Sequence, residues 1–286
     1  MSKVAIVTDS TAYLPMELLS GLPIHILPLQ VIWGDENFRD GVDIEPEAFY
    51  QKLATSPITP TTSQPSPKVF QDKYQELLDQ GFDILSIHIS SGLSGTIQSA
   101  EQAKQILNKA NIAIVDSHVT AMALGFNALI LARAAKDGAT LAECTQMAME
   151  MPQQSGAIFA VSTLEFLHKG GRIGSASAFL GTALKLKPIL WLSNGKIEAK
   201  EKIRTLNKAL DRLVTLMVEI AGENQKISIG IVHADAKDQG LAVLNKTIAA
   251  LGKDRVVESV ITSVSPVVGT HTGPGTVGIC YQIHDK

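Results

Sequence analysis

The chain has 286 residues, enough for one large or two ordinary domains, and 45% of them are hydrophobic, which is sufficient for buried cores. The formal net charge is −3 at neutral pH and no cluster of lysines or arginines stands out, so the basic surface of a nucleic-acid-binding protein is absent from the sequence. Two cysteines, Cys144 and Cys280, are too few for a disulfide framework and fit a reducing compartment. The composition therefore predicts a globular protein that binds a small ligand or a compact protein partner.

The N-terminal sequence does not have the pattern of a secretion signal. Its first apolar run is interrupted early by Thr8 and Asp9, and the best apolar stretch, residues 121–132, is too short to span a bilayer. We therefore expect a cytoplasmic protein.

In the first half of the chain, short apolar runs alternate with segments of helical period. The runs are residues 4–7, 84–89 and 112–115, and the helical segments are residues 70–78, 98–107 and 126–135. Such alternation indicates βαβ units and a parallel sheet covered by helices on both faces. Residues 24–33 differ and predict a longer strand or a hairpin. Residues 57–67, PITPTTSQPSP, are typical of a loop, because each X-Pro pair disfavours helix before it.

From about residue 156 the pattern changes to hairpins mixed with helices. Asn194-Gly195 lies between two strand-like runs, which is the strongest short-range indication of a hairpin. We expect further strands at residues 156–162, 227–232, 256–264 and 277–283, and helices at residues 164–170, 206–220 and 240–251. This mixture indicates an α+β domain. The sequence therefore predicts an N-terminal parallel-sheet α/β domain over residues 1–153 and a C-terminal α+β domain over residues 154–286.

The sequence ISSGLSGT, residues 89–96, places hydroxyl groups and glycines between a predicted strand and a predicted helix. Ligands bind at the carboxyl ends of strands in open α/β sheets, and the unpaired N–H groups of a helix N-terminus favour an anion there. The loop is therefore consistent with an uncharged anion-binding site. The alternative is that Ser90, Ser91 and Ser94 only cap the helix.

A nucleophilic serine is a second functional interpretation of the same loop. The G-x-S-x-G elbow of α/β-hydrolases is not matched around Ser94, because Gly95 comes one place too early and Thr96 stands where the last glycine belongs. A triad of Ser94, a histidine and an aspartate stays open, since the order of triad residues along a chain is not fixed, but no feature of the sequence selects the set.

Among the histidines, His271 lies between glycines and threonines, which is typical of an imidazole exposed to a ligand. His25, His88 and His233 lie within apolar runs and are expected to be structural. Residues 273–278, GPGTVG, match the dinucleotide fingerprint but leave no room for a βαβ unit. No Cys/His pair has metal-ligand spacing and no P-loop is present, so we expect no metal, no ATP and no other cofactor.

Taken together, the motifs resemble the DegV family, which is similar to the fatty-acid-binding subunits that partner bacterial fatty acid kinase. The resemblance covers nearly the whole chain, through IVTDSTAYLP, TTSQPSP, ISSGLSGTIQSA, VDSHVTAMALG, LEFLHKGGRIG, LKLKPIL and HTGPGTVGI. It implies a Rossmann-like, EDD/DegV-type N-terminal domain and an α+β second domain. It also implies a long-chain fatty acid buried between them, with its carboxylate near the hydroxyl loops and its tail inside the second domain.

Position by position, the resemblance places the carboxylate contacts at Thr62 of TTSQPS and Ser94 of SSGLSGT. Ser63 and Gly95, their neighbours, are the candidate backbone donors. His271 of HTGPG is the basic group implied beside them, and we include it with the fatty-acid-binding residues.

Two arginines also match basic positions of the family. Arg172 of GGRIG and Arg204 of KEKIRTLNKA look like groups that face the kinase or a phosphate. The chain departs from the family pattern where Thr205 replaces a glycine after Arg204, where Tyr13 replaces an aspartate, and where Ile97 replaces an aromatic residue. Because Thr205 follows Arg204 directly, this replacement weakens the match to the family at Arg204.

The resemblance implies that the protein takes a fatty acid from the membrane in a transient contact and presents the carboxylate to a separate kinase, which forms an acyl phosphate. About fifteen buried methylenes at about 0.8 kcal/mol each exceed association costs of several kcal/mol. Residues 175–192 offer apolar side chains for the tail, although an ordinary core explains them equally well. Two alternatives stay open: a serine acyl hydrolase or thioesterase that uses Ser94, and a binder of another amphiphilic anion.

Overall fold

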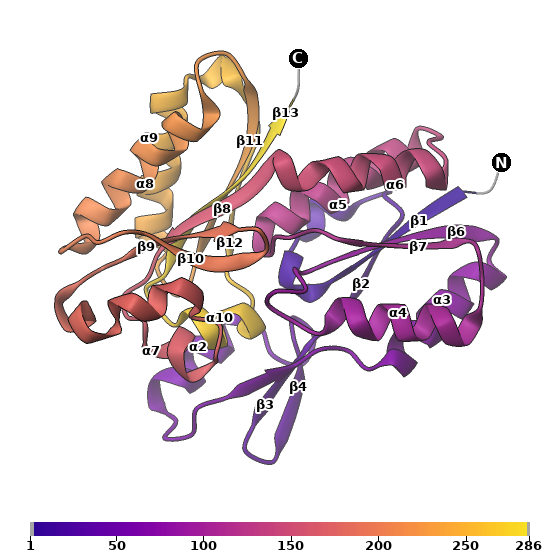
Figure 1. Ribbon diagram of the computed structural model, residues 1–286, viewed down its shortest axis with the longest axis horizontal. Helices are drawn as coiled ribbons and strands as arrows, with labels where there is room; N and C mark the ends of the chain where they lie inside the picture. The colour runs from indigo at the N-terminus through magenta and orange to yellow at the C-terminus, as the bar shows by residue number, and fades with distance from the viewer. Residues whose placement is uncertain (1–2, 285–286) are drawn as a thin grey trace.

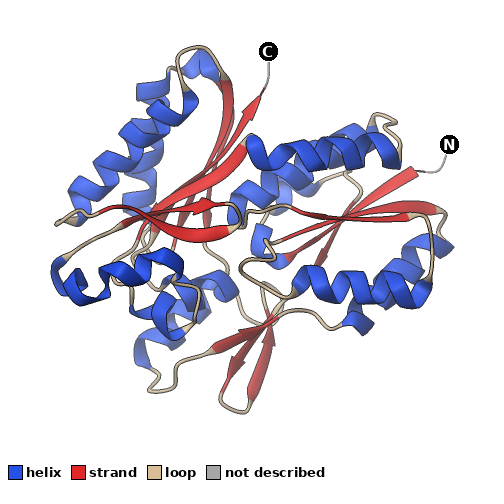
Figure 2. Cartoon of the chain, viewed as in Figure 1, coloured by secondary structure: helices blue, strands red, loops and turns tan. Residues whose placement is uncertain are grey.

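The structure is a computed structural model that describes residues 3–284, without the side chains of residues 180–185. Two main sheets lie next to each other with helices packed around them, and a small third sheet extends from one side (Figures 1 and 2). Part of the apolar segment expected to line the tail lies in residues 180–185, outside the described side chains.

The first sheet is the predicted parallel one. Its strands follow the order β2 (Ile24–Leu27), β1 (Lys3–Asp9), β6 (Phe82–His88) and β7 (Ile112–Asp116), and each pairs in parallel with its neighbours. The helices are α3 (Pro67–Asp79) and α4 (Thr96–Leu107) on one face, and α5 (Ala121–Lys136) and α6 (Leu141–Glu150) on the other (Figure 1). Apolar side chains alternate along β1 to serve both cores, with Val4 and Ile6 packed toward α5, and Ala5 and Val7 toward α3.

The run at residues 24–33 divides into two elements. Strand β2 ends at Leu27, Pro28 follows and cannot donate to a strand ladder, and β3 (Gln30–Trp33) then pairs with β4 (Glu36–Arg39) as a hairpin. The third sheet, of order β4-β3-β5, also contains β5 (Thr61–Ser63), so the loop prediction was wrong for these three residues. The helices α1 (Met16–Leu19) and α2 (Pro46–Thr55) flank this region.

The second sheet confirms the α+β expectation for the rest of the chain. Its strands follow the order β10 (Lys196–Glu201), β9 (Ile189–Ser193), β8 (Ser155–Ala160), β13 (Val277–His284), β11 (Lys226–His233) and β12 (Val256–Ser263). Only β11 and β12 pair in parallel, joined by α9 (Lys237–Leu251), and α8 (Leu206–Ala221) packs beside α9 on the same face. Positive φ angles at Asn194 and Gly195, +48° and +74°, form the predicted hairpin turn. The short helices α7 (Glu165–Lys169) and α10 (Pro266–Thr272) and the 3-10 segment 174–185 complete this half.

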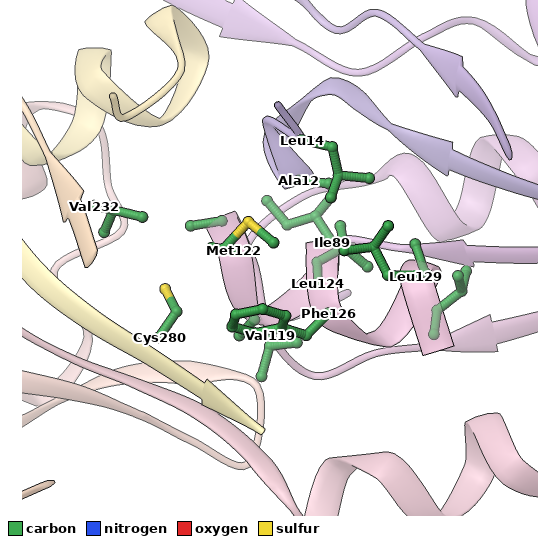
Figure 3. Packing of buried hydrophobic residues seen from close by; sticks show 14 of the residues in the cluster. Ala12, Leu14, Ile89, Val119, Met122, Leu124, Phe126, Leu129, Val232 and Cys280 are labelled. Atoms are coloured by element: carbon green, nitrogen blue, oxygen red, sulfur yellow. The ribbon is translucent and has the colours of Figure 1, made fainter. Parts of the chain in front are cut away.

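Helix α5 joins the two halves by packing against both sheets. Met122 and Phe126 of this helix contact Gly230 of β11, where a side chain on the glycine would overlap with Met122. Figure 3 shows Val232 and Cys280 on the strands that face Met122. The division of the chain at residue 153 stays a prediction, because the largest core contains residues from both sides of it. Within residues 3–284, no helix is both long enough and apolar enough to cross a membrane.

Candidate functional site

A cavity lies between the carboxyl edge of the first sheet, helix α10 and the inner face of the second sheet. The empty space between its walls is about 890 Å³, including the part open to solvent. Most of its wall is apolar. The apolar lining comes from Leu29, Ile89, Leu93, Ala157, Phe159, Leu192, Ile197, Val232, Val264, Val267, Val268 and Cys280.

The second sheet forms one wall with small residues between larger ones. Cys280 of β13 lies opposite Ala157 of β8, and Gly278 lies between Phe159 and Val232 on the neighbouring strands. Because side chains alternate along a strand, these residues share the inner face and point away from α8 and α9. The small side chains leave the space that the cavity occupies.

Thr62 and His271 form the first polar contact of the cavity, from elements that are far apart in sequence. Strand β5 carries Thr62 and helix α10 carries His271, and the Thr62 Oγ1 lies 2.8 Å from the His271 Nε2. Burial and then the positive charge of Arg172 lower the pKa of His271 to about 4, so its imidazole is neutral at neutral pH. Gly170 packs against the His271 ring at its Nδ1, and a side chain on Gly170 would overlap with that nitrogen.

Ser94 lies two residues before the first residue of α4, in the loop that follows the carboxyl end of β6, as predicted. Gly95 is the N-cap residue of α4, and among the described residues no side chain caps this helix, so the interpretation of the serines as caps was wrong. The Ser94 Oγ lies 2.8 Å from the Thr96 Oγ1, while the Ser90 hydroxyl donates to the Gly195 carbonyl at 2.7 Å. The first-turn N–H groups of α4 have no partners within the helix and give this place a partial positive charge.

Arg172 brings a full positive charge to the same part of the cavity. Its Nε donates to the carbonyl of Leu93 at 3.1 Å and its Nη1 donates to the carbonyl of Gly170 at 2.8 Å. The guanidinium therefore lies between the loop that carries Ser94 and the segment that packs on His271. An anion bound at the hydroxyls is close to a cation whose orientation is fixed by two backbone carbonyls.

The structure brings together most, but not all, of the residues selected from sequence. The residues Thr62, Ser63, Ser94, Arg172 and His271 all line the cavity. Gly95 follows Ser94 directly without lining it, and Arg204 is exposed between β10 and α8, outside the cavity wall.

Two parts of the wall were missed by sequence reasoning. Gln64 follows two selected residues in TTSQPS and lines the cavity. Helix α10 was not predicted, although the His271 that it carries was, and it adds Val267 and Val268 to the wall; it is only seven residues long and shows no clear period. Its start had a detectable pattern, because Ser265 accepts a hydrogen bond from the Val268 N–H and Pro266 occupies the first helical position.

A fully buried hydrogen-bond chain lies behind the loop. The Tyr74 hydroxyl donates to Ser86 at 2.6 Å, the Ser86 Oγ lies 2.6 Å from the His88 Nε2, and the His88 Nδ1 lies 3.0 Å from Asp9. These side chains have no solvent exposure, so His88 is structural, as expected, and this Asp-His-Ser array cannot meet a substrate. Asp9 also accepts from the Ile89 N–H at 2.8 Å, which fixes the start of the loop.

Ser94 is not arranged as the nucleophile of a triad. Its hydroxyl is paired with Thr96, and the imidazole in the cavity, that of His271, is paired with Thr62 instead. A hydrolase based on Ser94 needs a base within hydrogen-bonding distance of that hydroxyl. The geometry favours a site that holds an anion over one that activates a serine.

Comparison with known proteins places the chain in a family. The DegV family model, described as "Uncharacterised protein, DegV family", matches residues 3–284. Protein DegV of Bacillus subtilis is 37% identical over 279 residues, which cover 97% of this chain and 98% of that protein.

Solved structures of DegV proteins have the same fold. A structure described as fatty acid binding of a DegV family protein from Thermus thermophilus has a TM-score of 0.92 and 34% identity, and it covers 99% of this chain and 100% of its own. The structure of DegV from Bacillus subtilis, described as a fatty acid binding protein, has a TM-score of 0.89 and 35% identity, with the same coverage. The chain belongs to the DegV family.

Proposed function

We propose that the protein binds a long-chain fatty acid in the cavity, with the carboxylate held at Thr62 and Ser94. The observation that carries the proposal is a mostly apolar cavity in which hydroxyl, imidazole and guanidinium groups gather in one part. The two solved relatives described as fatty acid binding support the proposal, because their fold matches this chain along nearly its whole length.

The tail supplies most of the favourable free energy. Each methylene removed from water contributes about 0.8 kcal/mol, and ordering the ligand costs several kcal/mol in total, so a chain of fifteen or so carbons is bound tightly. The inner face of the second sheet, around Ala157, Gly278 and Cys280, is the wall along which we place the tail.

The carboxylate is the group that needs compensation, because a buried charge without partners is strongly unfavourable. In the Nε2–H tautomer of the neutral His271 imidazole, the ring donates to the Thr62 Oγ1 and leaves the Thr62 hydroxyl hydrogen free to donate to the ligand. Ser94 donates a second hydrogen bond, the backbone N–H groups of Ser63 and Gly95 are further donors, and Arg172 supplies the opposite charge. Each hydrogen bond to a charged group contributes about 1.5–3 kcal/mol.

We propose further that a separate fatty acid kinase subunit phosphorylates the presented carboxylate, and that this protein is not itself an enzyme. By this proposal it works in the cytoplasm and meets the membrane only transiently. The family resemblance supports the role. Arg204 is available to a partner because it is exposed outside the cavity wall.

The first experiment is mass spectrometry of the small molecules released when protein purified without added lipid is denatured. A fatty acid present at about one molecule per chain is the expected result, since tight binding retains the ligand through purification. Binding of added fatty acids to the delipidated protein is measured in parallel. An empty protein that also rejects added fatty acids would contradict the proposal and favour another amphiphilic anion.

The kinase-facing role of Arg204 has its own test. Arg204→Ala is expected to lower kinase-dependent turnover of the fatty acid while its affinity stays within about twofold, because the residue lies outside the cavity. Equal losses of turnover and of affinity would remove Arg204 from the kinase-facing surface.

A further inference from the structure

Gln64 is an exposed residue of the cavity wall for which the fold provides no structural role. It follows Ser63 at the end of β5 and lines the cavity beside the polar residues. Its side-chain amide forms no hydrogen bond with the part of the chain that the structure describes. The amide hydrogens are therefore available to a ligand.

The position of the amide is defined by Gly95. The φ angle of Gly95 is −77°, which any residue adopts, so backbone conformation does not require a glycine there. A Cβ on Gly95 would instead lie 2.9 Å from the Nε2 and 3.2 Å from the Cδ of Gln64. The missing side chain provides space for the Gln64 amide at the N-terminus of α4.

The backbone around Gln64 is held on both sides. Strand β5 pairs with β3 through Thr62 and Ser63, and Pro65, which follows Gln64, is buried. The backbone of Gln64 is therefore held in place, and its side chain reaches Gly95. It lies between strand β5, which carries Thr62, and the loop that carries Ser94.

We propose that Gln64 is a further ligand-contacting residue, whose amide rests on Gly95, donates a hydrogen bond to the bound carboxylate and shields that carboxylate from water. The proposal rests on the proposed function, since it assigns a role within the same site. It gives the cavity a means of distinguishing an acid from an uncharged lipid, because an amide N–H bonds more strongly to a carboxylate than to a hydroxyl.

The test compares the affinities for a fatty acid and for the fatty alcohol of the same chain length, measured by titration calorimetry on delipidated protein. Gln64→Glu is nearly isosteric and directs a negative charge at the ligand. We expect its affinity for the acid to fall at least about tenfold, while that for the alcohol changes less than about twofold. Gln105→Glu, the matched control, adds the same charge at an exposed residue in the last turn of α4, far from its N-terminus and outside the cavity wall, and should leave both affinities unchanged.

A double-mutant cycle tests the contact with Gly95. Gly95→Ala displaces the flexible Gln64 side chain, so it should weaken acid binding about as much as Gln64→Ala does, and the double variant should be no weaker than either single variant. Additive losses would show that Gly95 acts without Gln64 and would overturn the proposal.

The outcomes separate this assignment from the proposed function. Wild-type protein that binds the acid, with Gln64→Glu binding acid and alcohol as wild type does, would overturn the role of Gln64 alone. Equal weakening toward both lipids would also overturn it, because that is the result of a distorted cavity. Wild-type protein that binds neither lipid would overturn the proposed function and the role of Gln64 with it.

Discussion

Several polar residues of the cavity are fixed by a backbone group or by one another. Arg172 is held by the carbonyls of Leu93 and Gly170, and Thr62 is held by His271. Such fixed donors do not have to reorganise when an anion binds, and the low polarity of the surrounding wall strengthens their interaction with it. The proposed carboxylate site is therefore organised before a ligand arrives.

Removing the two hydroxyls should weaken binding of the carboxylate and leave the fold intact. Thr62→Val and Ser94→Ala each delete one donor, and we expect each to lower fatty acid affinity about tenfold to a hundredfold. Thermal unfolding of delipidated Ser94→Ala should match wild type, because its side chain is only half-buried, whereas Thr62→Val should lose some stability because it leaves the partly buried His271 Nε2 without its partner. The assignment of the carboxylate contacts fails if the double variant binds the acid as tightly as wild type.

A buried carboxyl group links the cavity wall to the pH dependence of stability. Asp40 accepts from the Ser10 hydroxyl at 2.6 Å and from the Val267 N–H of α10 at 3.2 Å, and burial raises its pKa to about 7. The folded protein thus holds this proton more tightly than the unfolded chain, whose aspartates titrate near pH 4. Its contribution to stability is full below about pH 4 and is lost as the pH rises through 7.

Asp40→Asn should remove that part of the pH dependence. We expect the free energy of unfolding of wild type to fall relative to that of the variant between pH 4 and pH 8, since the amide carries no charge at either pH. Denaturant titrations at matched pH values measure the difference. Parallel curves for the two proteins would mean that Asp40 has an ordinary pKa.

At the scale of elements, the β9–β10 turn contacts the loop before α4 closely. The Ser90 hydroxyl bonds to the carbonyl of Gly195, and a Cβ on Gly92 would lie 2.5 Å from the same carbonyl oxygen. Together with the bond from Arg172 to Leu93, this contact connects the loop that carries Ser94, in the first half, to the second half.

Gly195→Ala should therefore be unusually destabilising. Its φ of +74° disfavours any other residue by roughly 1–2 kcal/mol, and the added methyl would also overlap with Ser90. Gly81→Ala is the matched control, because Gly81 has a φ of +82° and no atom within 4 Å of its Cβ position. We expect the loss in free energy of unfolding to be larger for Gly195→Ala, and equal losses would show that the turn has room beside Ser90.

The elements that the sequence predicted correctly are those with a long repeating pattern or a fixed turn chemistry. The strands β1 and β6 are buried over most of their length, and β1, β6 and β7 each contain a run of apolar residues, while the β9–β10 turn is an Asn-Gly pair. Strand β5 and helix α10 are too short to show a period. Their conformations depend on tertiary contacts instead, those of β5 with β3 and those of α10 with α7.

The candidate site, too, could be predicted only in part from the sequence. Thr62 and Ser94 lie in motifs that the chain shares with a family, so the resemblance located them, and the structure brings both to the cavity. Gln64 had no chemical feature to distinguish it from an ordinary loop glutamine, because its position depends on Gly95, more than thirty residues away in sequence. The position of Arg204 away from the cavity depends on the course of the chain after β10, which no local pattern encodes.

At the scale of the whole molecule, neither half contains the site alone. Thr62 and Ser94 come from the first half of the chain, whereas Arg172, His271 and the wall around Cys280 come from the second. A ligand in this cavity contacts both halves at once, and α5 already packs between the two sheets. Binding therefore stabilises the arrangement of the halves as well as each of them.

Loading with fatty acid should raise the thermal stability of the whole chain in one transition. A ligand at a hundred times its dissociation constant adds about 2.7 kcal/mol to the free energy of unfolding, which corresponds to a rise of several degrees in Tm for a chain of this length. Scanning calorimetry of delipidated and loaded protein measures the shift, and Thr62→Val at the same ligand concentration should show a smaller one because its affinity is lower. A loaded protein whose halves unfold in two separate transitions, only one of them shifted, would place the ligand within a single half, in conflict with a cavity lined by both.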